Sequence, residues 1–289
     1  MTAILSNPQL PGTGIGQLRA APGKLTSALP PVTVILSFAV VLLVILWSLA
    51  PGIFTSYSPV NGDTAAKLAA PSAAHWFGTD YLGRDQYARV VYGTASSVTS
   101  ALVAVLIGLV VGSIIGLASG FRGGWLDAIL GRFVDVLLAI PGFLLAVVIV
   151  GSLGFQTINA AIATGVSAVA VFARLMRAAV IRVRSATYVE ASYLEGGTRL
   201  HALLGHILPN AYRSVLVLAV LQFGTSILVI ASLAFLGYGD PPPASDWGLL
   251  VASGKTYVTA PWLVYAPALV IVVTVLSVNR ISRWLRNAK

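Results

Sequence analysis

The sequence predicts an all-α integral membrane protein with six transmembrane helices. Hydrophobic residues make up 57% of the 289 residues and charged residues only 9%, whereas a soluble globular domain carries roughly 25% charged residues. A helix needs about 20 mostly apolar residues to span a bilayer. Six runs of that kind are present, at 32–50, 97–119, 133–153, 158–176, 215–236 and 262–278.

The distribution of basic residues predicts the orientation. If the amino terminus lies in the cytoplasm, fourteen of the 18 Lys and Arg residues are cytoplasmic, and the exceptions are Lys67, Arg84, Arg89 and Lys255. This bias follows the positive-inside rule. The formal net charge of +9 is therefore a topology signal, with a contribution from contact with anionic membrane lipid. It does not indicate nucleic-acid binding.

The amino-terminal elements are predicted from composition. Residues 1–31 are rich in Pro, Gly and small polar types and lack hydrophobic periodicity, so we expect a flexible cytoplasmic tail. The run at 32–50 is too long and begins too late for a signal peptide, which favours an uncleaved first span. An extracytoplasmic loop is predicted at 51–96, and a core of five helices at 97–289.

The outer loop contains the stretch GTDYLGRD at 78–85. Gly78 and Gly83 mark turns, and Asp80 or Asp85 can cap a short helix that follows. Two arrangements of the charges remain open. They form either a fixed ion-pair network that ties the loop to the bundle or a solvated surface of little energetic consequence. The residues concerned are Asp80, Arg84, Asp85 and Arg89.

The second and third spans each carry a packing signal. Glycines recur every four residues in the second span, which lets another helix approach closely, at Gly108, Gly112, Gly116 and Gly120. Pro141 is expected to kink the third span because it leaves a backbone carbonyl unpaired. A kink is compatible both with gating and with static packing.

The polar segment YVEASYLEGGTRLHALLGHILPN, at 188–210, lies between two long apolar runs. Gly196 and Gly197 predict a break between two short helices, and Thr198 can cap the second one. An i, i+3, i+4, i+7 stripe predicts that this second helix is amphipathic, with the residues Leu200, Leu203, Leu204 and Ile207. An ordinary pair of surface helices is the alternative.

No catalytic, cofactor or metal site is predicted. Cysteine is absent, and His201 and His206 are expected to lie roughly 140° apart on a regular helix. The stretch GKT at 254–256 follows a glycine at the wrong spacing for a phosphate-binding loop. The span centres lack the ionisable residues of an ion-coupled transporter. Neutral polar residues either line a path there or join helices by hydrogen bonds, among them Gln222, Thr225 and Ser226.

Two motifs resemble permeases of ATP-binding cassette (ABC) importers. Segment 188–210 is similar to their cytoplasmic coupling loop, whose pattern is E-A-A, three residues, G, and then L-P. The ending HILPN and the GTDYLGRD stretch resemble the oligopeptide and dipeptide branch. The matched coupling-loop positions are Glu190, Ala191, Ser192 (in place of the second alanine), Gly196, His206, Leu208 and Pro209. The outer signature is Gly78, Thr79, Asp80, Gly83, Arg84 and Asp85.

This resemblance implies a type I ABC importer permease fold in the bacterial cytoplasmic membrane, with a coupling loop at 187–210. It also implies a second homologous permease, two cytoplasmic ATPase subunits that hold ATP and Mg, and an extracytoplasmic solute-binding protein. Peptides are the implied substrates, although relatives import nickel complexes, haem, glutathione or oligosaccharides. The carboxyl end lacks the acidic ending common in the family, and Asp240 stands where the branch usually has glutamine. An ATP-independent channel or facilitator and a membrane scaffold are the alternatives.

Overall fold

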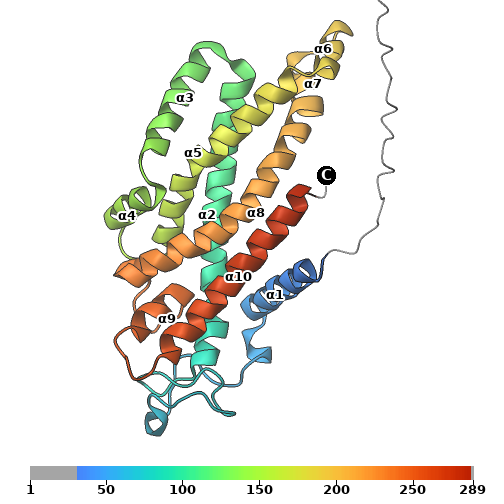
Figure 1. The fold of residues 1–289 in the computed structure, drawn as a ribbon. Helices are drawn as coiled ribbons and strands as arrows, with labels where there is room; N and C mark the ends of the chain where they lie inside the picture. The colour runs from blue at the N-terminus through green and yellow to red at the C-terminus, as the bar shows by residue number, and fades with distance from the viewer. Residues whose placement is uncertain (1–30, 288–289) are drawn as a thin grey trace, which may run out of the picture.

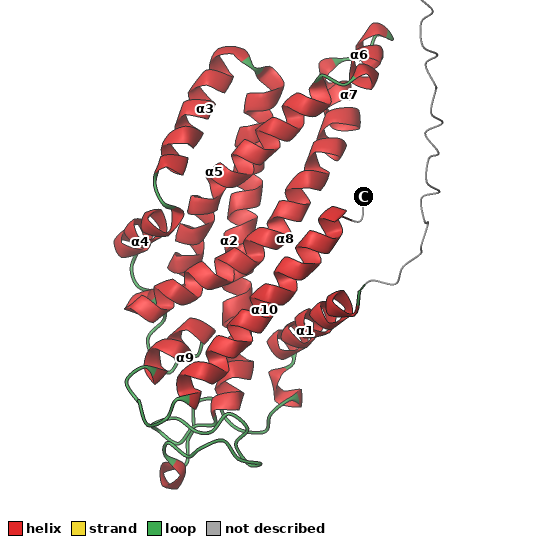
Figure 2. Ribbon diagram, viewed as in Figure 1, coloured by secondary structure: helices red, strands yellow, loops and turns green. Residues whose placement is uncertain are grey.

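The computed structural model describes residues 31–287, and its long elements are all helices (Figures 1 and 2). The predicted tail at 1–31 falls almost entirely outside this range. The helices are α1 (Val32–Leu49), α2 (Gln86–Arg122), α3 (Gly124–Ala139), α4 (Gly142–Leu153), α5 (Thr157–Arg184), α6 (Thr187–Leu194), α7 (Arg199–Ala202), α8 (Leu208–Leu233), α9 (Trp247–Gly254) and α10 (Trp262–Asn287).

The third predicted span is not one kinked helix. Within the described residues, five helices are long and apolar enough to cross a membrane, and α3 with α4 makes a sixth candidate that is bent by 90°. Pro141 lies at the break and is the N-cap of α4. Proline disfavours the helical conformation of the residue before it, and Ile140 is extended, with ψ 128°. The expected kink is therefore a complete break.

The outer loop is shorter than predicted, because α2 begins at Gln86 and runs for 37 residues. Residues 86–96 are helical and continuous with the second span, although they were expected to belong to the loop. The Asp85 side chain accepts a hydrogen bond from the amide of Ala88 and caps the helix. A helix of this length spans about 55 Å, well beyond a hydrocarbon core of about 30 Å.

The glycine repeat of α2 lets another helix approach closely, as predicted, and the structure shows that this helix is α5. A Cβ atom added at Gly112 would lie 2.5 Å from the carbonyl oxygen of Val169. A Cβ atom at Gly120 would lie 2.9 Å from the carbonyl oxygen of Arg177. Side chains at these positions would force the backbones apart. The two helices are therefore closely packed along the glycine repeat.

The two segments singled out by the sequence lie at opposite ends of the bundle. In Figure 1, α6 and α7 form one end, while α9 and the loop that precedes α2 gather at the other. We refer to these as the α6–α7 end and the outer-loop end. The core between them includes Phe172 and Met176, which are almost completely buried. Many large apolar side chains on the helix faces are exposed in this single chain, as expected of surfaces that face lipid or another subunit.

Candidate functional site

The α6–α7 end is a helical hairpin whose turn depends on two glycines for different reasons. Gly196 has φ +88°, in the left-handed region that glycine adopts without a steric penalty, and a Cβ atom there would meet nothing within 4 Å. Gly197 lacks space instead, because a Cβ atom would lie 2.5 Å from the carbonyl oxygen of Ser192. The predicted break is confirmed, and its steric constraint lies at Gly197.

The second short helix continues directly into a membrane helix. Thr198 caps α7 by accepting a hydrogen bond from the amide of His201, as predicted. A π-helical turn, Leu203–Ile207, then joins α7 to α8. Leu208 and Pro209 are the first residues of α8 and do not belong to a loop. Proline cannot donate the regular helical hydrogen bond, and the π turn ends directly before Leu208 and Pro209.

The predicted amphipathic stripe is only partly correct. Ile207 is fully buried, but Leu200 and Leu204 are 63% and 55% exposed. The π turn changes the angular spacing of the residues, so the 3.6-residue period does not hold across it. In α6, Leu194 is 89% exposed. The hairpin therefore presents apolar side chains that no part of residues 31–287 covers.

The same π turn overturns the expected separation of the two histidines. The rings of His201 and His206 pack edge to face, with centroids 5.7 Å apart, because the wider turn brings residues five apart to one side. Tyr188 lies against His206 at a centroid distance of 6.2 Å. Among the described residues, no group of three or more His, Cys, Asp or Glu side chains could hold a metal ion.

Glu190, Ala191 and Ser192 lie on α6. Glu190 is exposed and lines a hollow of about 740 Å³, which it shares with three arginines at the ends of other helices, Arg122, Arg184 and Arg199. Arg184 donates to the backbone carbonyls of Gly120 and Phe121, at the last turn of α2. These hydrogen bonds join the end of α5, which directly precedes the hairpin, to the end of α2.

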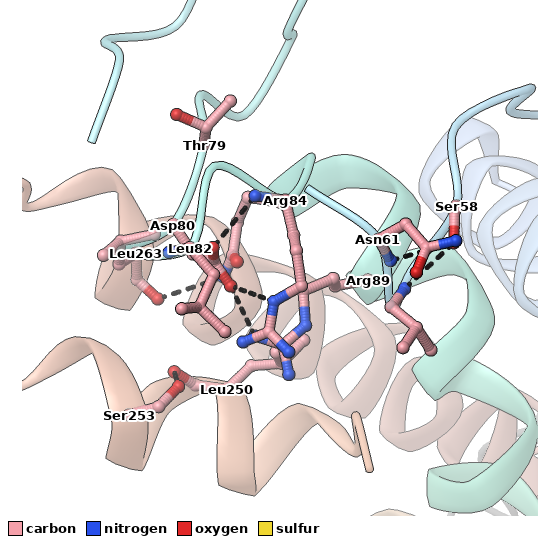
Figure 3. A network of polar contacts seen from close by, with 12 residues as sticks. Ser58, Asn61, Thr79, Asp80, Leu82, Arg84, Arg89, Leu250, Ser253 and Leu263 are labelled. Carbon is pink, nitrogen blue, oxygen red and sulfur yellow. Dashed lines mark hydrogen bonds and ion pairs between the residues drawn. The ribbon is translucent and has the colours of Figure 1, made fainter. Parts of the chain in front are cut away.

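At the outer-loop end, the GTDYLGRD charges form a buried network (Figure 3). Asp80 Oδ2 accepts hydrogen bonds from Arg84 Nε at 2.7 Å and from Arg89 Nη1 at 2.8 Å. Its other oxygen accepts from the backbone amides of Leu82 and Arg84. The side chains of the three ionised residues are only 3–4% exposed. The ion-pair interpretation is therefore correct for Asp80, Arg84 and Arg89, whereas the buried Asp85 contacts His75 instead. The solvated surface is excluded.

Hydrogen bonds in and around this network join the outer loop to α2, to the segment before α9 and to α10. Arg89 donates to the carbonyl of Ala244, in the segment before α9. The Trp262 indole, at the start of α10, donates to the carbonyl of Thr79. Gly78, with φ +68°, lies directly under that indole, where a Cβ atom would be 2.6 Å from the ring nitrogen. Asp85 caps α2 with one oxygen and contacts His75 Nδ1 at 2.8 Å with the other.

Gly83, the other glycine that was predicted to mark a turn, also lies where a side chain cannot fit. Gly83 has φ +76°, and a Cβ atom there would collide with the backbone carbonyl of Asp63.

In the segment before α9, Asp246 caps that helix by accepting a hydrogen bond from the amide of Leu249. Burial raises the pKa of the Asp246 carboxyl above its usual value. The outer-loop end is thus closed by buried polar contacts.

The three mid-span polar residues chosen from the sequence lie on α8. Thr225 donates to the backbone carbonyl of Gln222, a local hydrogen bond within the helix. Ser226 is completely buried, so it does not line an open path in this conformation. Gln222 and Thr225 are partly exposed.

The sequence reasoning missed a cluster of charges between α3 and α5. Arg177 makes a bidentate ion pair with Asp127, with distances of 2.6 and 2.7 Å, and Asp127 also accepts from the Ser119 hydroxyl. Arg174 and Asp135 lie close by and line the same hollow. The prediction from the sequence concerned only the span centres, and these residues lie nearer the ends of the apolar runs. The available signal was a single acidic residue in the third predicted span, Asp135, and a single basic residue in the fourth, Arg174.

A bundle of apolar helices with a buried polar network at one end and an exposed helical hairpin at the other is the architecture of an integral membrane protein. Residues 108–288 match the family described as "Binding-protein-dependent transport system inner membrane component". The chain belongs to this family and is a permease subunit of an ABC importer of the inner membrane.

The relatives cover most of the chain. It is 37% identical over 258 residues to the probable D,D-dipeptide transport system permease protein DdpC of Escherichia coli, covering 89% of this chain and 86% of that protein. It is 40% identical over 219 residues to the glutathione transport system permease protein GsiD of Escherichia coli, covering 75% and 72%. An inward-facing structure of the MetNI methionine ABC transporter shares the fold, with a TM-score of 0.57, 19% identity, and coverage of 69% and 96%.

Proposed function

We propose that this permease forms half of the translocation pathway of an importer for small peptides. The relatives named for D,D-dipeptide and glutathione transport support this substrate class. A second homologous permease completes the pathway, and an extracytoplasmic solute-binding protein delivers the substrate. Two ATPase subunits hold ATP and Mg and supply the energy, so this chain itself requires no cofactor and no catalytic site.

The α6–α7 hairpin is the part that couples this chain to an ATPase subunit. The observation that carries this assignment is its connection to two membrane helices without a flexible linker. Only two residues separate α5 from α6, and residues 199–238 form one helical segment from α7 through α8 and beyond. Displacement of such a hairpin must move α5 and α8, because packed helices shift as rigid elements.

The exposed surface of the hairpin agrees with this role. Leu194 and Leu200 are 89% and 63% exposed, although apolar side chains at the water-facing end of a membrane protein gain stability when a partner covers them. The adjacent arginines give the same end a positive charge. We assign this end to the cytoplasm, in agreement with the positive-inside rule.

The orientation can be tested with cysteines, because the natural chain has none. Position 80 is unsuitable for this purpose, since Asp80 is only 2% exposed. Val60→Cys, at an exposed position of the outer loop, should react with an impermeant thiol reagent on intact cells. Glu190→Cys should react only after the membrane is permeabilised. The reverse pattern would overturn the orientation.

The transport assignment is tested with the complete importer in proteoliposomes. Uptake of dipeptide should require the solute-binding protein and ATP, and it should stop when the ATPase subunits carry a hydrolysis-deficient substitution. The isolated permease should neither bind nor hydrolyse ATP. Dipeptide uptake by the permease subunits alone, driven only by a concentration gradient, would support the facilitator instead.

A further inference from the structure

A hollow of about 350 Å³ lies between α2, α3 and α5, and we call it the α3–α5 hollow. It is lined by five charged side chains, Asp127, Arg132, Asp135, Arg174 and Arg177. All five belong to helices assigned to the membrane. Charged residues in such helices are costly and usually mark a pathway or a binding site.

Only two of these charges are accounted for by pairing. Asp127 and Arg177 neutralise each other through their bidentate contact. The four ion pairs found among residues 31–287 include neither Arg132, Asp135 nor Arg174. Two positive charges and one negative charge therefore face the hollow without a partner of opposite sign within 4.0 Å.

Asp135 and Arg174 lie at corresponding depths on the two helices. Asp135 is eleven residues from the start of α3, and Arg174 is ten residues from the end of α5, which places each about 15 Å from the α6–α7 end of its helix. If α5 is centred in a hydrocarbon core about 30 Å thick, Arg174 lies roughly 9 Å inside it. On that placement, opposite charges line one hollow inside the hydrocarbon core, with side chains that are exposed in this single chain.

Small residues keep this hollow open. Gly116, Gly131 and Ala173 are part of its lining, and a Cβ atom added at Gly131 would meet nothing within 4 Å. Its volume is within the range of about 300–1,000 Å³ that is common for small-molecule sites. The hollow is therefore large enough for a compact polar ligand.

We propose that the α3–α5 hollow binds a small peptide zwitterion during transport, with the peptide ammonium at Asp135 and the peptide carboxylate at Arg174. A guanidinium group binds a carboxylate through two parallel hydrogen bonds, and a carboxylate accepts from an ammonium group. This inference rests on the proposed peptide function and adds a specific site to it. The second arginine, Arg132, leaves the hollow with a net charge of +1, which favours a peptide with an additional carboxylate.

The second permease offers a different explanation of the same charges. Its side chains could cover the hollow and pair with Asp135 and Arg174 in the assembled importer. In that case the hollow is protected from reagents whether or not a peptide is present. A peptide site is instead protected only by peptides that carry the matching charged termini.

A cysteine at position 131 distinguishes these cases, because the natural chain has no cysteine and the site has room for a side chain. Gly131→Cys is introduced into the complete importer in proteoliposomes, and the rate of thiol modification of this chain is followed. The probes are alanyl-alanine, its N-acetyl form and its C-terminal amide. Ile129→Cys is the matched control, since Ile129 is 57% exposed on the same helix and does not line the hollow.

We expect alanyl-alanine to slow modification at position 131 and to leave position 129 unchanged. Asp135→Asn should raise the concentration needed for protection by about tenfold to a hundredfold, since one charged hydrogen bond is lost. The same variant should not affect protection by the N-acetyl peptide, which has no ammonium group. Arg174→Gln should likewise weaken protection by alanyl-alanine. It should not affect protection by the C-terminal amide, which has no carboxylate. An acidic dipeptide should protect better than a basic one.

Equal modification rates with and without peptide would overturn the proposal, as would protection by both blocked peptides that equals the protection by alanyl-alanine. Peptide-independent protection would overturn it in favour of the interface between the two permeases. ATP-dependent uptake is measured on the same vesicles. Normal uptake without protection at position 131 rejects only the site, whereas loss of ATP dependence in the wild-type importer rejects the proposed function.

Discussion

The two ends of this permease are stabilised in different ways. At the outer-loop end, three ionised side chains are 3–4% exposed and are held by mutual contacts. At the α6–α7 end, Glu190 is exposed and apolar side chains such as Leu194 remain uncovered. The charged network of the first end is formed within one chain, although apolar side chains such as Trp76 are exposed there too. The second has the character of a surface that a partner completes.

This contrast separates two kinds of motif. The GTDYLGRD signature is a structural clamp whose charges satisfy one another and hold together the outer loop, α2 and α10. The coupling-loop signature makes few internal contacts, and its glycine at position 196 controls only the path of the backbone. Substitutions in the clamp should therefore change stability. Substitutions in the hairpin should change transport while the protein stays folded.

The largest effect is expected for Asp80→Ala. This variant leaves Arg84 and Arg89 buried without their carboxylate, and removal of one partner from a buried ion pair costs about 3–5 kcal/mol. The purified importer should unfold at lower temperature, and the variant should accumulate poorly in the membrane. Thermal unfolding in detergent, with wild type measured alongside, provides the measurement.

Asp63→Ala is the matched control for this prediction. Asp63 lies in the same loop and caps a short 3₁₀ turn by accepting from the amide of Ala65, but its side chain is exposed. Loss of such a cap costs about 1 kcal/mol. Equal destabilisation by the two substitutions would show that the buried network does not stabilise the outer-loop end.

Glu190→Lys and Gly196→Asp are expected to have an intermediate effect, which changes transport and leaves folding largely intact. Both positions are exposed, and Asp is among the residues that enter the left-handed region most readily, so stability should fall by no more than about 1–2 kcal/mol. Each variant should insert normally and lose most of its ATP-driven uptake, because the changed hairpin no longer fits the ATPase. Uptake and substrate-stimulated ATP hydrolysis are compared at matched expression.

Glu195→Lys provides the control, since Glu195 is an exposed acidic residue at the end of the same helix but does not line the arginine-rich hollow. It makes the same change of charge without removing the carboxylate at position 190. Wild-type uptake and hydrolysis in both the Glu190→Lys and Gly196→Asp variants would contradict the coupling role of the hairpin.

Local rules predicted those parts of the fold that depend on neighbouring residues. The glycine repeat of α2, the cap at Thr198 and the turn at Gly196 each follow from residue type and spacing, and the structure confirms all three. The boundary of α2 was missed because residues 86–96 include polar types that weaken an apolar run. Their burial results from distant segments, as where Ser245 approaches Gly93.

The other features that were predicted wrongly or missed lie where tertiary packing alters a local sequence pattern. A π turn before Pro209 broke the 3.6-residue period and brought His201 against His206. The contact between Asp127 and Arg177 joins residues 50 positions apart, so it depends on how α3 packs on α5. Sequence patterns that treat each helix alone could not provide that information. The α3–α5 hollow is therefore a finding of the structure.

The smallest effect is expected for Asp246→Asn, which tests whether burial at the outer-loop end is costly for a carboxylate. Asparagine keeps the cap on α9 and removes the charge. Because burial raises the pKa of Asp246 in the folded state, the folded protein binds a proton more readily than the unfolded chain. The contribution of Asp246 to the free energy of unfolding should therefore increase as the pH falls through this raised pKa and be lost as the pH rises. Wild type should gain stability relative to Asp246→Asn on acidification, by about 1.4 kcal/mol per unit of pKa shift. A difference in stability that does not vary with pH would show that Asp246 has the same pKa in both states.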